Sequence, residues 1–203
     1  MTLRLSLAAI VATLGLAACS SAPTHYYTLL PPLSGQVASH TAPAAFQFEL
    51  APVRMPVQVD QPQLVVRQSN GSLAILESER WSAPLGDEFH DALAGQLEQQ
   101  LGVRDLAGLP KTSGKPVLTL RTDVRRFDML PERYALIDVV WSLNLRSEGS
   151  PRRTLTCSSI IREPAGMELE NLVIAHQKAI ATLAKTIAQT AQRWNELPTT
   201  ECP

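Results

Sequence analysis

The sequence has no excess of basic residues, no long apolar run beyond its first 18 residues, and few cysteines. Its 18 Lys and Arg residues are matched by 19 Asp and Glu, so it lacks the positive charge that binding to a phosphate backbone requires. A membrane-crossing helix needs about 20 apolar residues in succession, and the chain after residue 18 contains no such run. We therefore expect no nucleic-acid partner and no membrane-spanning helix in that part.

Signatures of catalysis are also missing. No Gly-x-Ser-x-Gly motif occurs, and the cysteines that could act as nucleophiles, Cys157 and Cys202, lie in a predicted strand and at the C-terminal end. The sequence therefore predicts a protein without catalytic residues, cofactor or enzymatic activity. A periplasmic hydrolase would need a cleft that joins His90 or His176 to a carboxylate and an exposed hydroxyl.

One cluster of potential metal ligands contains Asp87, Glu88, His90 and Asp91. The dipole of the predicted helix is a sufficient reason for acidic residues in its first turn, so we expect no metal ion there. His176 falls within the apolar stripe of the last predicted helix. We expect it to be partly buried and hydrogen-bonded to a neighbour.

The first 19 residues have the layout of a secretory signal. Arg4 precedes an apolar stretch of about a dozen residues, which is too short to span a bilayer, and small residues then lead to Cys19. This ending, Leu-Ala-Ala-Cys, resembles the bacterial lipoprotein signal. The resemblance implies that residues 1–18 are removed and that Cys19 carries the acyl chains, while Ser20 in place of Asp implies transfer to the outer membrane. The alternative is a plain signal peptide or an anchor helix with Cys19 there by chance.

Removal of residues 1–18 leaves 185 residues with a net charge of −2, enough for one domain with a hydrophobic core. Residues 19–45 are rich in Ser, Ala, Pro and Thr and are predicted to form a lipidated tether, and residues 46–203 the domain. Within the tether, Tyr26 to Leu30 could pair as an edge strand or remain a loose linker. In an oxidising compartment Cys157 and Cys202 could form a disulfide, unless Cys157 is simply a buried small hydrophobe.

Alternation with period two predicts the strands. We expect strands at 46–50, 64–67 and 73–76, the last two joined by a turn at Asn70-Gly71, and a meander of strands at 117–124, 139–146 and 154–161. Residues four apart predict a helix over 85–101, with Gly102 as its stop and Gly95 as a costly interior residue that could allow close approach to the sheet.

A second amphipathic helix is predicted over 168–194, roughly 40 Å long, so that one end would overhang a sheet of ordinary strands. The resulting fold class is α+β: a twisted, mainly antiparallel sheet of about six strands in the order βββαβββα, with both helices on one face.

Several short motifs carry a resemblance to a known family. They are Tyr26-Tyr27-Thr28-Leu29 shortly after Cys19, Pro52-Val53-Arg54-Met55-Pro56, the segment from Gln61 to Arg67, and Arg80-Trp81 with Pro84-Leu85. In this order they resemble the ABC-type transport auxiliary lipoprotein family over most of residues 19–195.

The resemblance implies a non-catalytic periplasmic lipoprotein that docks an MCE-domain protein of a lipid transport system at the outer membrane. A homo-oligomer is left open, and so is the transported lipid. A second hypothesis is a structural lipoprotein that scaffolds another envelope complex, which also predicts no turnover.

Overall fold

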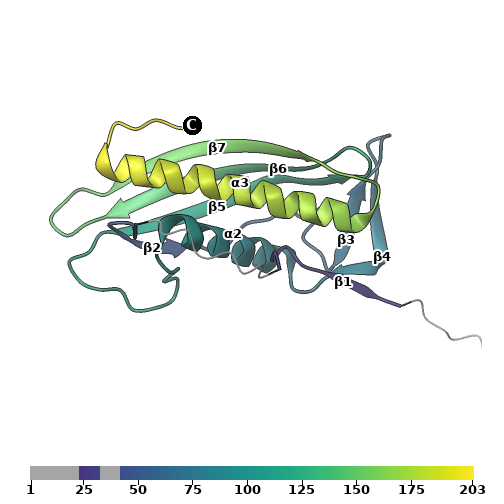
Figure 1. Ribbon diagram of the computed structural model, residues 1–203, viewed down its shortest axis with the longest axis horizontal. Coiled ribbons are helices and arrows are strands. Elements are labelled where there is room, and N and C mark those ends of the chain that lie inside the picture. Colours follow the sequence, from purple (N-terminus) through teal and green to yellow (C-terminus); the bar gives the residue numbers. More distant parts are fainter. Residues whose placement is uncertain (1–22, 33–41) are drawn as a thin grey trace, which may run out of the picture.

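The computed structural model describes residues 23–32 and 42–203. The predicted signal sequence and Cys19 lie outside these residues. In the described part, seven strands and two helices confirm the α+β class (Figure 1). In chain order they are β1 (His25–Tyr27), β2 (Gln47–Leu50), β3 (Gln63–Arg67), β4 (Leu73–Trp81), α2 (Leu85–Leu101), β5 (Val117–Leu130), β6 (Tyr134–Arg146), β7 (Arg153–Pro164) and α3 (Leu169–Glu196).

The predicted element order is present from β2 onward, and β1 precedes it. The strand around Tyr26 is therefore confirmed, and the loose-linker alternative is wrong for the residues of β1. The strands divide into two mixed sheets, β1-β4-β3 and β2-β5-β6-β7, where a single sheet was predicted. The division follows from Pro52 and Pro56, which end the short β2 so that β3 starts a separate sheet beside the later part of β5.

The β5–β6–β7 meander has the predicted antiparallel neighbours, but its strands are longer than predicted. A bulge between Val124 and Arg126 adds one residue to β5. Beyond the bulge Phe127 and Met129 face the core, so the inward positions change from even to odd numbers and the alternation that predicts the strand stops early.

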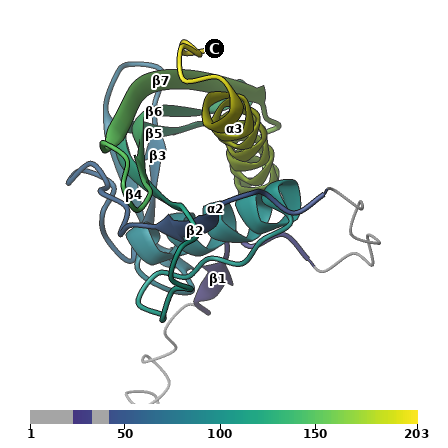
Figure 2. The ribbon, with the colours of Figure 1, turned by 90° about the vertical axis from the view of Figure 1, so that its left-hand side faces the viewer.

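Helix α2 begins at Leu85 and ends at Leu101, as predicted, and Gly102 closes it in the left-handed conformation at φ 64°. Gly95 does not allow a close approach, because a Cβ atom built on it would meet no atom within 4 Å. Both helices lie on the same side of the curved meander, with α3 against α2, β6 and β7 (Figure 2).

The predicted overhang of the last helix is wrong. With 28 residues α3 is about 42 Å long, and the 14 residues of β5 span about 46 Å, so helix and sheet match in length. Trp194 near the end of α3 is 3% exposed, and the Arg153 guanidinium lies 4.9 Å from its ring centre.

Phe127 joins the layers of the core. Its ring meets Trp81 of β4 and Phe89 of α2 edge-on, with centroids 6.0 and 6.5 Å away, and stacks on His176 of α3. The first sheet and both helices therefore share one hydrophobic core with the meander.

A disulfide joins Cys157 of β7 to Cys202 in the C-terminal tail, with a Cα–Cα distance of 5.5 Å. Cys157 is buried among core residues. The tail after α3 is thereby held along the meander.

Candidate functional site

Among the residues considered for metal binding, the side chains of Glu88 and His90 contact different neighbours. Glu88 is 3% exposed and faces the N-terminal segment, whereas His90 places Nδ1 3.1 Å from Asp91 and Nε2 3.4 Å from the carbonyl oxygen of Leu50. Among the described residues, no three His, Cys, Asp or Glu side chains are grouped so that they could hold a metal ion.

His176 is fully buried, and its ring stacks 3.8 Å above Phe127 with a 4° angle between the planes. The expectation of a partly buried ring is wrong, because His176 is completely buried, and neither ring nitrogen has a hydrogen bond of regular geometry among the described residues, the backbone of Asp128 being its polar neighbour. Burial lowers the pKa of His176 to about 3 against a smaller opposing effect of Asp128. The ring is neutral near pH 7 and out of reach of a substrate, so it offers no support for a hydrolase.

The best-defined polar arrangement surrounds residues 23–32, which we call the arm. β1 runs parallel to β4, and the N–H of Ser82 donates to the carbonyl oxygen of Tyr27 at 2.8 Å. His25 Nδ1 lies 3.1 Å from Glu79 Oε1, and this contact lowers the pKa of Glu79. The arm is therefore paired to the edge of the first sheet, although it lies in the segment predicted as a tether.

Glu88 is the central contact of the arm. Its Oε2 accepts hydrogen bonds from Thr28 Oγ1 at 2.7 Å and from the N–H of Leu29 at 2.8 Å, and its Oε1 accepts one from Ser82 Oγ. Leu29 is fully buried beside it. A buried carboxylate is stable where hydrogen bonds replace its lost water, so docking of the arm and burial of Glu88 depend on each other.

Helix α3 holds the arm from the other side. Gln177 Nε2 donates to the carbonyl oxygens of Thr28 at 3.1 Å and Leu30 at 3.3 Å, and the Tyr27 hydroxyl donates to Glu170 at 3.4 Å. Burial and neighbouring carboxylates raise the pKa of Tyr27, which keeps its hydroxyl protonated as a donor. Both helices and the first sheet thus contact ten residues of chain that begin four positions after Cys19.

Sequence reasoning missed the roles of Glu88 and Gln177. Glu88 fits the acidic pattern of a helix start, and Gln177 fits the polar face of α3, so neither stands out. The available signal was Leu29, an apolar residue among the Ser, Ala and Pro of the tether, which has to bury its side chain against some surface.

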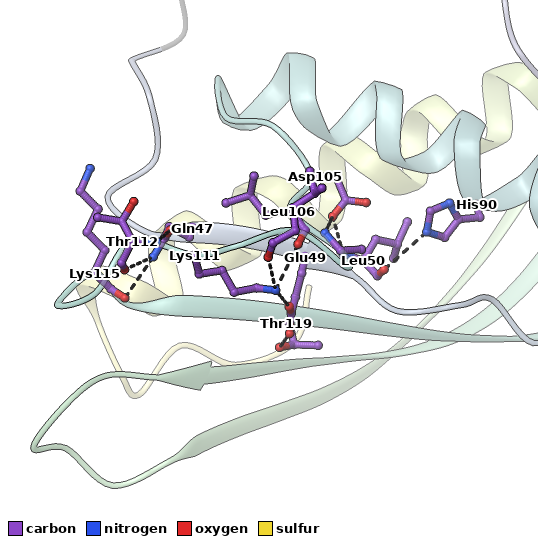
Figure 3. A network of polar contacts seen from close by, with 12 residues as sticks. Gln47, Glu49, Leu50, His90, Asp105, Leu106, Lys111, Thr112, Lys115 and Thr119 are labelled. Atoms are coloured by element: carbon purple, nitrogen blue, oxygen red, sulfur yellow. Dashed lines mark hydrogen bonds and ion pairs between the residues drawn. The ribbon is translucent and has the colours of Figure 1, made fainter.

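A second polar network fixes the long loop over 102–116 (Figure 3), which lies at the opposite end of the molecule from β1 (Figure 1). Gln47 Nε2 donates to the carbonyl oxygen of Thr112 at 2.8 Å, and the N–H of Thr112 donates back to Gln47 Oε1 at 2.6 Å. Asp105 Oδ1 accepts from the N–H of Leu50 at 3.0 Å. β2 therefore holds the loop through both backbone and side chains.

Glu49 completes this network. It forms an ion pair with Lys111 at 2.6 Å and accepts a hydrogen bond from Thr119, and Lys111 also donates to the carbonyl oxygen of Leu106 at 3.1 Å (Figure 3). Burial acts to raise the pKa of Glu49, but the hydrogen bonds from Lys111 and Thr119 outweigh it and lower the pKa.

Comparison with known families points to a lipoprotein rather than an enzyme. The family model described as ABC-type transport auxiliary lipoprotein component matches residues 27–188, and the chain belongs to this family. The match begins inside the arm and includes Thr28 and Leu29. Membership points to a non-enzymatic part in transport and implies a transporter partner.

Two solved structures share the fold. An uncharacterized protein is 17% identical with a TM-score of 0.62, over 83% of this chain and 98% of its own. Protein XCC0632 from Xanthomonas campestris is 14% identical with a TM-score of 0.55, over 88% of this chain and 98% of its own. No curated protein matches the chain in sequence. Neither helix in the described residues is both long and apolar enough to cross a membrane.

Proposed function

We propose that the protein is acylated at Cys19, is anchored by these acyl chains to the periplasmic side of the outer membrane, and supports an MCE-type lipid transport system without catalysis of its own. The domain docks an MCE-domain protein and so connects the transport path to the membrane and supports membrane integrity. Membership of the transport auxiliary lipoprotein family supports the class of function.

Docking of the arm is the observation that carries this proposal. The four residues from Cys19 to residue 23 reach at most about 14 Å when fully extended. Because Glu88 and Gln177 hold the arm on the domain, an acylated Cys19 keeps one end of the molecule near the membrane. A long flexible tether would set no such orientation, whereas a docking subunit gains from a fixed one.

Co-purification tests the function. The acylated, C-terminally tagged protein is extracted from envelopes in mild detergent, and the proteins that stay bound after washing are identified by mass spectrometry. We expect an MCE-domain protein at a reproducible ratio to the tagged protein. Its repeated absence, with a different envelope assembly recovered in its place, would contradict the proposal and favour the scaffolding hypothesis.

Cys19→Ser provides the matched control for the anchor. We expect it to abolish incorporation of labelled fatty acid and to leave the precursor uncleaved, because the thiol is the acceptor of the lipid. Labelling that persists in Cys19→Ser would show that the acylation site is wrong, independently of the partner.

A further inference from the structure

A hollow of about 690 Å³ opens between the two sheets at the end of the molecule where the arm docks. β3 pairs with β4 but not with β5, and β2, the strand that pairs with β5 on that side, ends at Leu50. Side chains rather than backbone hydrogen bonds therefore connect β3 to β5, with Arg67 Nη2 3.0 Å from Asp128 Oδ1. The hollow lies at this seam, beside the β3–β4 and β5–β6 turns and the start of α3.

Half of the residues that line the hollow are apolar, and apolar atoms supply the larger part of its surface. The apolar residues come from β3, β4, the end of β5 with the turn after it, and α3: Val66, Ala74, Leu76, Leu130, Pro131 and Leu169. Five of these side chains, all except that of Val66, are only half-buried, so burying them further against an apolar ligand is favourable. The volume falls within the roughly 300–1,000 Å³ of small-molecule sites.

Charges at the rim are largely paired. Arg67 lies 3.0 Å from Asp128, whose side chain is 7% exposed and also pairs with Arg126, and Glu132 and Arg133 are adjacent residues of opposite sign. The three arginines and two carboxylates leave an excess of one positive charge at an exposed rim, where salt screens it, so recognition has to come from the apolar walls.

The position of the hollow indicates the source of such a ligand. Figure 1 shows β1, β3, β4 and the start of α3 at one end of the molecule and the C-terminus toward the other. The arm begins at this first end, within about 14 Å of chain from Cys19. If Cys19 is acylated, as proposed above and on which this placement rests, the hollow lies at the membrane-facing end.

We propose that this hollow binds one hydrocarbon chain of a membrane phospholipid, without selection for the headgroup. The chain packs against Leu76, Leu130 and Leu169 at the seam between the sheets. The domain then contacts the lipid itself in addition to anchoring near it.

Photo-crosslinking tests this site with the acylated protein reconstituted in vesicles of phosphatidylethanolamine and phosphatidylglycerol. The probe is a trace of phosphatidylcholine with a diazirine at the end of one acyl chain, and cross-linked peptides are mapped by mass spectrometry. We expect cross-links on the walls of the hollow, unchanged between low and high salt. Cross-links spread over the outer surface, or lost at high salt, would overturn the proposal.

Two variants of neighbouring residues sharpen the test. Ala74→Phe fills the hollow and should lower the cross-linking there about fivefold, whereas Ile75→Phe changes a residue that is 49% exposed and does not line the hollow, and should have no effect. Thermal melting checks that both variants fold, and Ala74→Leu replaces Ala74→Phe if the larger ring does not. Equal cross-linking in the Ala74 and Ile75 variants would contradict the assignment.

A photoreactive fatty acid incorporated at Cys19 tests the other possible occupant of the hollow, the protein's own acyl chain. Cross-links from the protein's own acyl chain to the walls, with none from vesicle lipid, would overturn the proposal of a membrane phospholipid. The vesicles contain no transport partner, so these results stand or fall independently of the co-purification with an MCE-domain protein.

Discussion

The two ends of the molecule hold irregular segments in different ways. At the end of the arm, β1 pairs with the edge of β4, a single carboxylate, that of Glu88, binds both Thr28 and Leu29, and α3 adds contacts through a few side chains. In the other half, the loop over 102–116 is bound through several mutually supporting contacts, and the C-terminal tail is bound covalently. One substitution, at Glu88, can therefore loosen the arm beyond β1, whereas the distal half, which contains the loop over 102–116 and the C-terminal tail, has no single residue on which its contacts depend.

This difference suits an anchored docking protein. In the function proposed above, an arm that is held by non-covalent contacts can dock after acylation of Cys19, whereas a surface that binds a partner benefits from being preorganised. The predictions below test this contrast between the two ends, from the largest expected effect to the smallest.

Loss of the disulfide should give the largest change and should be confined to the distal half. The bond closes a loop with a sequence separation of 45, so Cys202→Ser should lower the free energy of unfolding by about 2–4 kcal/mol. Urea denaturation measures the loss, and hydrogen exchange should show a more open C-terminal tail with the arm unchanged. A thiol count on the denatured, unreduced protein that finds both cysteines free would refute the disulfide itself.

Removal of the carboxylate of Glu88 should release the arm. Glu88→Ala leaves the N–H of Leu29 and two hydroxyls without their acceptor, and we expect a cost of about 2–3 kcal/mol together with faster hydrogen exchange over residues 25–30. Asp87→Ala is the matched control, because Asp87 is exposed in the same helical turn and should change stability by less than about 0.5 kcal/mol. Equal hydrogen exchange of the arm in Glu88→Ala and Asp87→Ala would show that Glu88 is not the central contact of the arm.

Acid should weaken the half of the molecule that holds the arm. The pKa of His176 is about 3 in the native state and about 6.5 when unfolded, so the unfolded chain takes up a proton first as the pH falls. The stability due to neutral His176 is complete above pH 6.5 and should decline by about 1.4 kcal/mol per pH unit below it. Denaturation at pH 7 and pH 5 measures the decline, and His176→Phe, which retains a ring on Phe127, should remove this part of the pH dependence. A decline that is unchanged in His176→Phe would assign it to other groups.

Local patterns predict the two helices and the order of strands from β2 onward well. The four-residue spacing from Leu85 to Leu101 and the left-handed Gly102 agree closely with α2, because that helix buries one simple stripe. The same reasoning places the end of β5 six residues too early, since the bulge before Arg126 reverses which positions face inward. It also predicts one sheet where there are two, because pairing between distant strands depends on turns and prolines rather than on alternation.

The candidate site was less predictable. The role of Glu88 depends on Thr28 and Leu29, about 60 positions earlier in the chain, and no local pattern connects them. His176 was expected to have a hydrogen-bond partner, yet its ring is stacked face to face on Phe127, a residue beyond the predicted end of its strand. Both cases are tertiary contacts between residues that are unremarkable in their own segments.

The distal network should tolerate the loss of one member better than the arm does. Lys111→Ala removes the ion pair with Glu49 and the hydrogen bond to Leu106, and we expect a cost of about 1 kcal/mol because the contacts of Gln47 and Asp105 remain. Since the pKa of Glu49 is lowered in the native state, its contribution is present above about pH 4.3 and is lost as the pH falls through the native pKa.

Urea denaturation of Lys111→Ala and of Lys115→Ala measures that cost, with Lys115 as the control because its side chain is exposed. A loss for Lys111→Ala as large as that for Glu88→Ala would remove the contrast between the two ends.

Gly95 should give the smallest effect, and one of opposite sign. It lies in the interior of α2, the helix that carries Glu88 near its start and leads into the loop over 102–116 at its end, so it belongs to neither region. A Cβ atom at this position would meet nothing within 4 Å, and the backbone is helical, so Gly95→Ala should stabilise the protein by about 0.5–1 kcal/mol through the reduced freedom of the unfolded chain. Urea denaturation should show this gain in stability. Hydrogen exchange should change no more in the arm than in the loop over 102–116. A destabilised Gly95→Ala would mean that α2 needs the flexibility of glycine to reach both ends, and the two regions would then be coupled through the helix rather than held independently.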